Sequence, residues 1–258
     1  MKYFVFACLL LLLISPACRK AETGLRLSPP DWQPETLRYV VLSEGEPVGS
    51  AIQYISPTTT ESGAMLEFTQ VTATGTGDEQ ARDSSWLLFR ADNLRPVHSF
   101  RTVTSGDNAL WSEVSYSNDQ AAIQAMTPMG ARAIDLDITP TDFDNDQLTT
   151  LLRALEVGPQ DSIKLGVVVG LVGSDIDVTV NRVGLETVTV PAGSFETRRL
   201  QLDIAGQVVD LWYETGGRRR LVRYEAPGGV MVMELAPAPA PEEAPAPPPG
   251  DKPPRTGR

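Results

Sequence analysis

The sequence predicts an all-β fold, in which an antiparallel, curved sheet closes into a roll or barrel and one amphipathic helix lies near residues 144–157. Short runs of alternating apolar and polar residues recur through most of the chain, and a period of two is typical of half-buried strands. Gly, Pro, Asn and Asp interrupt these runs at close intervals, which suits tight connections between antiparallel strands. One segment has helical spacing instead.

The predicted strands follow one another along the body of the chain with short gaps. They cover residues 37–43, 49–55, 64–74, 84–90, 96–104, 110–117, 121–127, 131–138, 162–169, 176–183, 186–191, 195–204, 207–214, 218–226 and 230–235. In the strand at 195–204, the alternation places Phe195, Leu200, Leu202 and Ile204 on the buried side and Arg199, Gln201 and Asp203 toward water. The alternation breaks near Thr197, where we expect a bulge.

The corner before this strand reads Val190-Pro191-Ala192-Gly193. Pro191 suits the second position of a type I turn and Gly193 the fourth. We therefore interpret Ser194 as the start of the next strand, because the chain has no G-x-S-x-G elbow that would make this residue a nucleophile.

The helical segment lies within residues 139–159. Its four leucines fall at i, i+3, i+4 and i+7 and form one apolar stripe: Leu148, Leu151, Leu152 and Leu155. Asp144 or Asn145 can cap the start of the helix, and Gly158-Pro159 should end it. We expect about three turns that cover an opening or a face of the sheet.

The N-terminus has the pattern of a secretory signal peptide, with Lys2 followed by an apolar run over 4–14. The run is shorter than the roughly 20 residues of a membrane-spanning helix. Residues 15–18 resemble the lipobox of bacterial lipoproteins, whose Cys receives diacylglycerol, and Cys18 occupies that position. Ordinary signal peptidase could also cut after Ala17, which would leave a soluble periplasmic protein.

We interpret Cys18 as a lipid anchor, because removal of Cys8 with the signal would leave one Cys that has no internal disulfide partner. The expected location is the cell envelope of a Gram-negative bacterium. Arg19 after the Cys resembles the pattern that permits sorting to the outer membrane, where the protein would face the periplasm.

The expected organisation is a signal peptide at 1–17, a tether at 18–35, a β-roll domain at 36–235 and a disordered Pro/Ala-rich tail at 236–258. The whole chain has 22 Lys and Arg against 33 Asp and Glu, a net charge of −11. This acidic balance argues against a nucleic-acid partner.

The sequence shows no catalytic constellation, and we expect no cofactor and no metal. His98 is the single histidine, so a zinc set or a His-based triad has no partners to use. Asp142, Asp144 and Asp146 alternate like the start of a calcium loop, but Gln147 replaces the required Gly. Helix capping is therefore the preferred interpretation of this acidic run.

An arginine cluster follows Gly216-Gly217. It comprises Arg218, Arg219, Arg220 and Arg223. A solvated hairpin edge, whose charges discourage aggregation, is the preferred interpretation. The alternative is a candidate contact for an anion or a partner protein.

The order of several elements resembles the exported bacterial family called domain of unknown function 3108. The strand pair at 39–49, the Leu-Arg-x-Leu segment at 152–155, the corner at 190–195 and the late Trp strand with its return at 210–235 carry the resemblance, which covers residues 37–235. It implies an all-β curved or rolled sheet in the cell envelope and supplies no catalytic residues.

These observations favour a non-enzymatic envelope lipoprotein whose β-roll acts as a binding or interaction domain. One alternative is a carrier of a lipid or other apolar ligand inside the roll. Another is an envelope hydrolase, which would need at least two carboxylates with perturbed ionisation in one pocket. A third is a structural partner protein with a filled interior.

Overall fold

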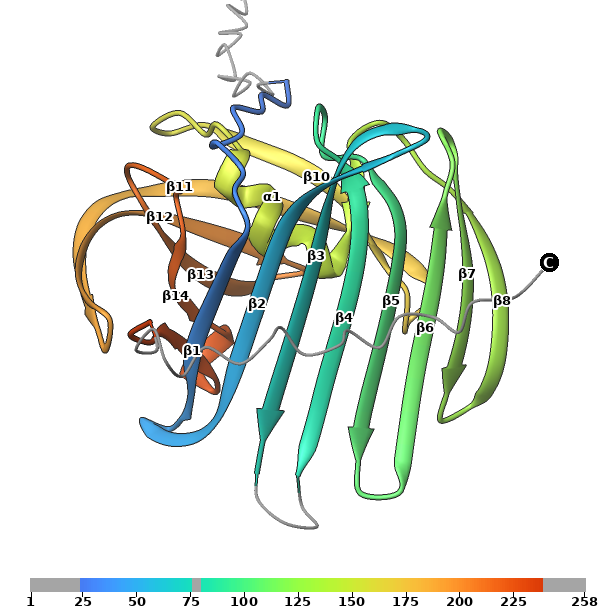
Figure 1. Ribbon diagram of the computed structural model, residues 1–258, viewed down its shortest axis with the longest axis horizontal. Helices are drawn as coiled ribbons and strands as arrows, with labels where there is room; N and C mark the ends of the chain where they lie inside the picture. Colours follow the sequence, from blue (N-terminus) through green and yellow to red (C-terminus); the bar gives the residue numbers. More distant parts are fainter. Residues whose placement is uncertain (1–23, 76–79, 239–258) are drawn as a thin grey trace, which may run out of the picture.

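The computed structural model describes residues 24–75 and 80–238. The predicted signal peptide, Cys18 and most of the predicted tail lie outside these residues. All the strands form one sheet, in the order β8-β7-β6-β5-β4-β3-β2-β1-β15-β14-β13-β12-β11-β10-β9 (Figure 1). Every neighbouring pair except β1 and β15 is consecutive in the sequence, so the sheet is built almost entirely from hairpins.

The strands of the first half are β1 (Glu35–Ser43), β2 (Glu46–Thr60), β3 (Gly63–Thr74), β4 (Ala81–Arg90), β5 (Pro96–Ser105), β6 (Asn108–Tyr116), β7 (Gln120–Thr127) and β8 (Gly130–Asp137). Those of the second half are β9 (Asp142–Asp144), β10 (Ser162–Val169), β11 (Ser174–Val190), β12 (Gly193–Ile204), β13 (Gln207–Glu214), β14 (Leu221–Glu225) and β15 (Val232–Leu235). Short 3-10 turns η2 (Asn145–Gln147) and η3 (Pro227–Gly229) and one helix, α1 (Leu148–Ala154), complete the fold.

The all-β prediction is confirmed, but the expected hydrogen-bonded closure of the sheet is wrong. The end strands β8 and β9 do not pair with each other, and the three-residue β9 runs parallel to β10. The two ends of the sheet meet through side chains instead, because Val168 of β10 packs in a cluster with Val114, Ile123 and Ile138. The sheet is therefore curved and barrel-like, and each end strand has one edge that pairs with no other strand.

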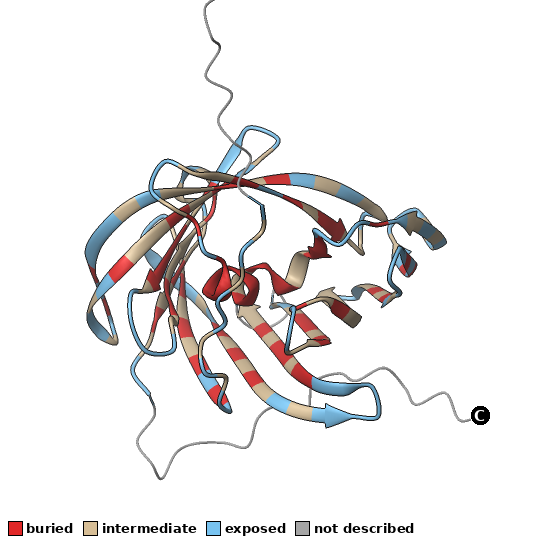
Figure 2. Cartoon of the chain, turned by 90° about the horizontal axis from the view of Figure 1, so that it is seen from above, coloured by how far each residue is buried: buried red, intermediate tan, exposed pale blue. Residues whose placement is uncertain are grey.

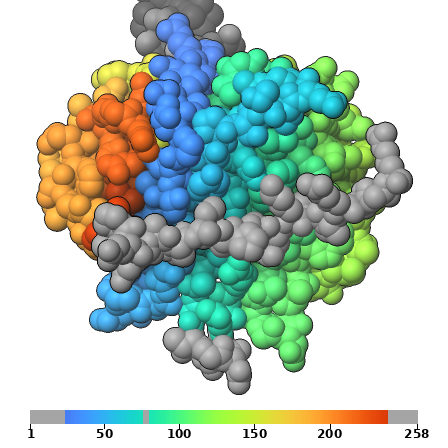
Figure 3. Space-filling model, in the orientation of Figure 1, coloured from blue at the N-terminus to red at the C-terminus, as the bar shows by residue number. Residues whose placement is uncertain are grey.

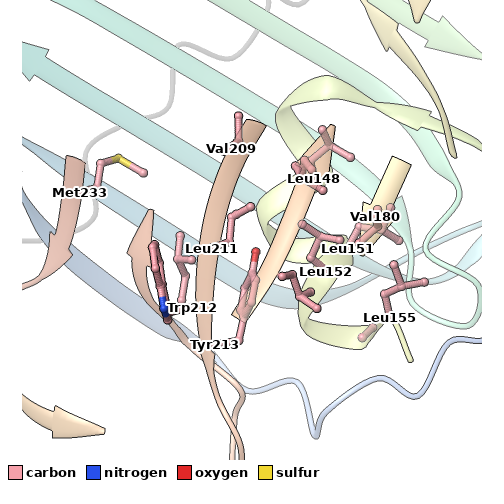
Figure 4. Packing of buried hydrophobic residues seen from close by; sticks show 14 of the residues in the cluster. Leu148, Leu151, Leu152, Leu155, Val180, Val209, Leu211, Trp212, Tyr213 and Met233 are labelled. Carbon is pink, nitrogen blue, oxygen red and sulfur yellow. The ribbon is translucent and has the colours of Figure 1, made fainter. Parts of the chain in front are cut away.

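The helix lies inside the curve of the sheet (Figure 2). The predicted stripe is correct, since all four leucines are buried. In Figure 4, Leu151 and Leu152 lie beside Leu211 and Tyr213 of β13, whereas Leu155 lies farther away, on the side of Val180. This apolar stripe therefore fills much of the interior of the curved sheet.

The helix is two turns long rather than three. Leu155 leaves helical geometry, with φ −73 and ψ 125, and forms a bridge with Leu27. Arg198 of β12 donates hydrogen bonds to the carbonyls of Leu152 and Leu155 at 2.7 and 3.0 Å. These tertiary partners bond the free carbonyl groups at the end of the helix, so the helix ends before Gly158-Pro159.

Two strands differ from their predicted form. Residues 176–183 and 186–190 belong to the single long strand β11, which continues through a bulge between Arg182 and Gly184, and Pro191 lies in the turn that follows. The irregularity that we expected near Thr197 of β12 lies in this partner strand. Short β9 was not predicted, because its two aspartates suggested the start of the helix, whereas the structure buries all three residues.

The outer face of the sheet displays the strand order directly. Figure 3 shows the N-terminal segment, in blue, between the cyan strands of the first half and the orange strands of the second half. This position follows from the pairing of Tyr39 in β1 with Ala51 in β2 and with Leu235 in β15. β1 thus joins the two halves of the sheet.

Candidate functional site

A cavity of about 260 Å³ lies on the concave side of the sheet, beside the start of α1. One wall is apolar and comes from the C-terminal strands and the loop before β15. It contains Leu202, Ile204, Val209, Leu211, Tyr224, Met231 and Met233. The remaining lining comes from β3, β4, β5, the turn η2 and the first residues of α1: Gln70, Thr72, Asp83, Arg101, Asn145, Asp146, Leu148 and Thr149. The cavity is therefore two-sided, with an apolar surface opposite a charged one.

Arg101 organises the charged wall. Its Nε and Nη2 donate to the two carboxylate oxygens of Asp83 at 3.0 and 2.6 Å. Its Nη1 donates to Oδ1 of Asp146 at 2.9 Å. Burial opposes the charge of Arg101, but the negative charge of Asp146 and the hydrogen bonds that Arg101 donates to Asp83 outweigh this effect and raise the pKa of Arg101. The guanidinium thus stays charged and ties β4 and β5 to the entry of α1.

Asp144 lies behind this wall and is 3% exposed. Its Oδ2 accepts a hydrogen bond from the Tyr116 hydroxyl at 2.6 Å, and its Oδ1 accepts one from the backbone N–H of Asp146 at 2.8 Å. Burial raises the pKa of Asp144, and burial together with the charge of Asp144 raises the pKa of Tyr116. Asp144 therefore caps the 3-10 turn η2. The predicted capping of the helix itself is wrong, because α1 begins at Leu148 and its N-cap residue, Gln147, makes no side-chain capping bond.

Asp146 is the member of the acidic run that lines the cavity, and its side chain is 16% exposed. Burial raises its pKa to about 7, with Arg101 acting in the opposite direction and Asp144 and Asp83 reinforcing the rise. The group can therefore gain or lose a proton near neutral pH. Asp142 has a different role, because it accepts a hydrogen bond from the backbone N–H of Thr139.

The four arginines predicted as candidate anion or partner contacts lie outside this cavity, and each has an acidic partner. Arg218 lies 3.7 Å from Glu35, Arg219 3.1 Å from Glu156, Arg220 2.5 Å from Glu214, and Arg223 2.9 Å from Glu225 and 3.5 Å from Glu234. The carbonyl of Arg218 also accepts from Arg153, which forms a buried ion pair with Glu35 at 2.9 Å. The cluster thus takes part in a network of ion pairs.

The corner at 190–193 connects β11 and β12 through Pro191 and Ala192. Gly193 has φ 130, a backbone conformation that favours glycine. The Oγ atoms of Ser194 and Thr189 lie 2.8 Å apart on the exposed surface. The N–H of Ala192 donates to the carbonyl of Leu235 at 3.0 Å, so the corner is attached to the last strand.

His98 lies on β5, where its Nε2 is 2.9 Å from Oε1 of Glu113 and its ring meets Trp86 edge to face at 5.7 Å. Within residues 24–75 and 80–238, no group of three or more His, Cys, Asp or Glu side chains has an arrangement that could hold a metal ion. The same residues include no helix that is long and apolar enough to cross a bilayer.

Asp83, Arg101 and Tyr116 were not identified as site residues from the sequence, although the alternation of the strands contained one indication of them. Leu87 and Phe89 are buried in β4, and the period of two that they establish places Asp83 on the same inward face. The register of β4 and β5 then pairs Ser85 with Arg101, next to Asp83 on that face. Charged residues on the inward face of two neighbouring strands are the pattern that could have indicated the charged wall of the cavity.

Comparison with one solved structure supports the fold. A β-barrel-like protein of domain of unknown function DUF1849 from Brucella abortus aligns with a TM-score of 0.50 and 8% identity, over 82% of this chain and 98% of that chain. A protein with a YmcC-like fold from Bacteroides fragilis NCTC 9343 aligns with a TM-score of 0.36 and 12% identity, over the same shares of the two chains. No curated protein matches the chain. The family model described as "Protein of unknown function (DUF3108)" matches residues 36–236, and this chain belongs to that family.

Proposed function

We propose that this protein is a non-enzymatic lipoprotein of the cell envelope whose curved sheet binds an apolar ligand in the cavity beside α1. The observation that carries the proposal is the apolar wall of that cavity. Leu202, Val209, Leu211 and Met233 belong to the hydrophobic core cluster, and the same side chains also border a cavity of about 260 Å³.

The size and lining of the cavity suit a small ligand or one short chain. Pockets that enclose drug-sized molecules occupy about 300–1,000 Å³ and combine apolar walls with a few polar groups. The volume of the cavity lies just below that range, and its lining likewise combines an apolar wall with a few polar groups. α1 fills much of the remaining interior, so the protein is neither an empty barrel nor a completely packed one.

The proposed location rests on the N-terminal sequence. The signal-like segment before Cys18 supports export, and a lipid on Cys18 would attach the protein to a membrane. We propose the outer membrane, with the domain in the periplasm. A partner protein of the envelope remains compatible with this arrangement, because the cavity occupies only the concave side of the sheet.

Binding can be tested with the neutral fluorescent probe N-phenyl-1-naphthylamine. Val209 lines the cavity, whereas the neighbouring Val208 is 41% exposed on the other face of β13. We expect Val209→Phe to fill the cavity and to weaken binding of the probe at least about tenfold, since the added ring takes the ligand's space. Val208→Phe adds the same ring outside the cavity and should leave the affinity within about twofold.

Circular dichroism and urea unfolding of both variants would show that the fold is retained. Equal binding by the two variants, or no binding by the parent protein, would argue against an apolar ligand in this cavity.

The anchor has an independent test, because Cys18→Ser should release the protein from the membrane fraction and remove the mass of the lipid. Unchanged fractionation and mass would contradict lipidation.

A second candidate function is an envelope hydrolase, and the raised pKa values of Asp144 and Asp146 favour it. These carboxylates meet the requirement for perturbed ionisation near one pocket. The geometry limits their roles, because both oxygens of Asp144 already accept hydrogen bonds from Tyr116 and Asp146. Asp146 is therefore the candidate acid. Hydrolysis of a chromogenic ester or glycoside that Asp146→Asn abolishes would favour this function over binding alone.

A further inference from the structure

The turn η2 and the first residues of α1 present unused hydrogen-bond acceptors at the cavity wall. Oδ1 of Asp146 accepts from Arg101 and from Asn145, whereas Oδ2 accepts from no residue in the described ranges. Oγ1 of Thr149 is buried and has no partner in the same part of the chain. Both residues line the cavity. A buried polar atom without a partner is unfavourable. Oγ1 of Thr149 is such an atom, and together with the free Oδ2 of Asp146 at the cavity it indicates a ligand that donates hydrogen bonds.

The cation in this wall is already engaged. Arg101 directs donors from all three guanidinium nitrogens to Asp83 and Asp146. With Asp144 behind them, carboxylates outnumber the guanidinium three to one in this part of the wall. An anionic head group would lose its hydration and meet negative charge without a cation available to pair with it.

Resting on the proposed function, we infer that the ligand is an amphiphile whose polar end is a primary ammonium group. The ammonium would lie against Asp146 and Thr149, and the apolar chain would extend along the wall formed by Val209, Leu211 and Met233. A primary ammonium has three donors and no acceptor, which matches a wall of unused acceptors. The two faces of the cavity thus match the two ends of such a molecule.

The ionisation of Asp146 is consistent with this ligand. Its pKa of about 7 reflects burial beside Asp144 and Asp83, with Arg101 as the neighbouring cation. A second cation at Oδ2 would favour the ionised carboxylate and form a charge-assisted hydrogen bond. At pH 8 the carboxylate is largely ionised before the ligand arrives, so binding at this pH measures head-group preference with little proton uptake.

Isothermal titration calorimetry of the purified protein at pH 8 tests the inference. The probes are decylammonium, decanol and decanoate, which share one chain length and differ in the head group, each below its micelle concentration. We expect decylammonium to bind at least about tenfold more tightly than decanoate, as for a hydrogen bond between charged partners. Asp146→Asn should reduce this preference to about threefold or less.

Thr149→Val is a second variant that keeps the shape of the side chain and removes the hydroxyl. It should weaken decylammonium several-fold and leave decanoate unchanged. Asp177→Asn removes an exposed carboxylate of β11, outside the cavity, and is the matched control. The preference of this control variant for decylammonium over decanoate should equal that of the parent protein. This comparison separates a local effect at the cavity from a change in net charge.

The outcomes distinguish this inference from the proposed function. Similar binding of all three probes would overturn the ammonium preference and leave an apolar site in place. Tighter binding of decanoate would also overturn it. If none of the probes bound and N-phenyl-1-naphthylamine did not bind either, both the inference and the proposed function would be wrong.

Discussion

At the scale of residues, neighbouring acids of one short run take different roles. The sequence places Asp144 and Asp146 at a helix start, and the structure shows Asp144 as the cap of the 3-10 turn η2 and Asp146 at the cavity. Sequence reasoning could predict a capping role for Asp144, because capping depends on residues two or three positions away. It could not predict the pairing with Arg101, because the register of distant strands sets that contact.

The pKa of Asp146 predicts a specific pH dependence of stability. This pKa is about 7 in the folded protein and near 3.9 in an unfolded chain. The folded state therefore holds the proton more tightly. The resulting contribution to stability is fully present below about pH 4 and is lost as the pH rises through about 7.

Asp146→Asn removes this titration, so we expect the stability of the variant relative to the parent to rise between pH 4 and pH 8. Urea unfolding at several pH values would measure it. Asp144 titrates in both proteins and its pKa is also raised, so some pH dependence persists in the variant. Parallel profiles for the variant and the parent would show that Asp146 is not perturbed.

At the scale of elements, local patterns predicted which helices and strands exist and which faces they bury better than they predicted where each element begins and ends. The leucine stripe identified the helix and its buried face, but Leu27 and Arg198 end the helix early, and both lie far away in the sequence. Likewise, the two predicted strands within β11 are one strand, because the bulge near Val183 interrupts the alternation without ending the pairing with β12. Tertiary pairing decided both boundaries.

The hairpin between β11 and β12 provides a test at this scale. Gly193 has φ 130, so we expect Gly193→Val to destabilise the protein by roughly 1–3 kcal/mol through backbone strain. Gly184→Val is the matched control in the same pair of strands, because a Cβ there would meet open space and its φ is not in the positive region. The free energy of urea unfolding measures both. Equal losses for the two variants would contradict a special role for the conformation of Gly193.

At the scale of the whole molecule, the sheet depends on one pairing between distant parts of the chain. Each strand other than β1 and β15 pairs only with sequence neighbours, whereas Tyr39 of β1 pairs with Leu235 of β15. The backbone N–H of Ala236 also donates to the carbonyl of Arg38 at 2.8 Å. β15 therefore holds the two half-sheets together, although it is only four residues long. The alternating pattern predicted many hairpins but could not show which distant strands would meet.

Removal of β15 should consequently affect the entire domain. A chain that ends at Gly229 lacks this strand, and we expect it to lose cooperative thermal unfolding and to aggregate through the exposed edges of β1 and β14. A chain that ends at Ala238 retains β15 and should unfold within a few degrees of the parent. Differential scanning calorimetry and size-exclusion chromatography measure these effects. A cooperative, monomeric chain without β15 would show that the half-sheets are independent.

The pairing of the first strand with the last has a consequence for synthesis and for the proposed export. The hairpins of each half need only nearby residues and can form early, but β1 has no partner on one side until the chain reaches residue 232. Contacts between such distant residues form slowly, because a long loop must close first. A chain that passes through a membrane from its N-terminus thus completes its sheet only after nearly all of it has crossed. This order helps to keep the chain unfolded while it is being translocated.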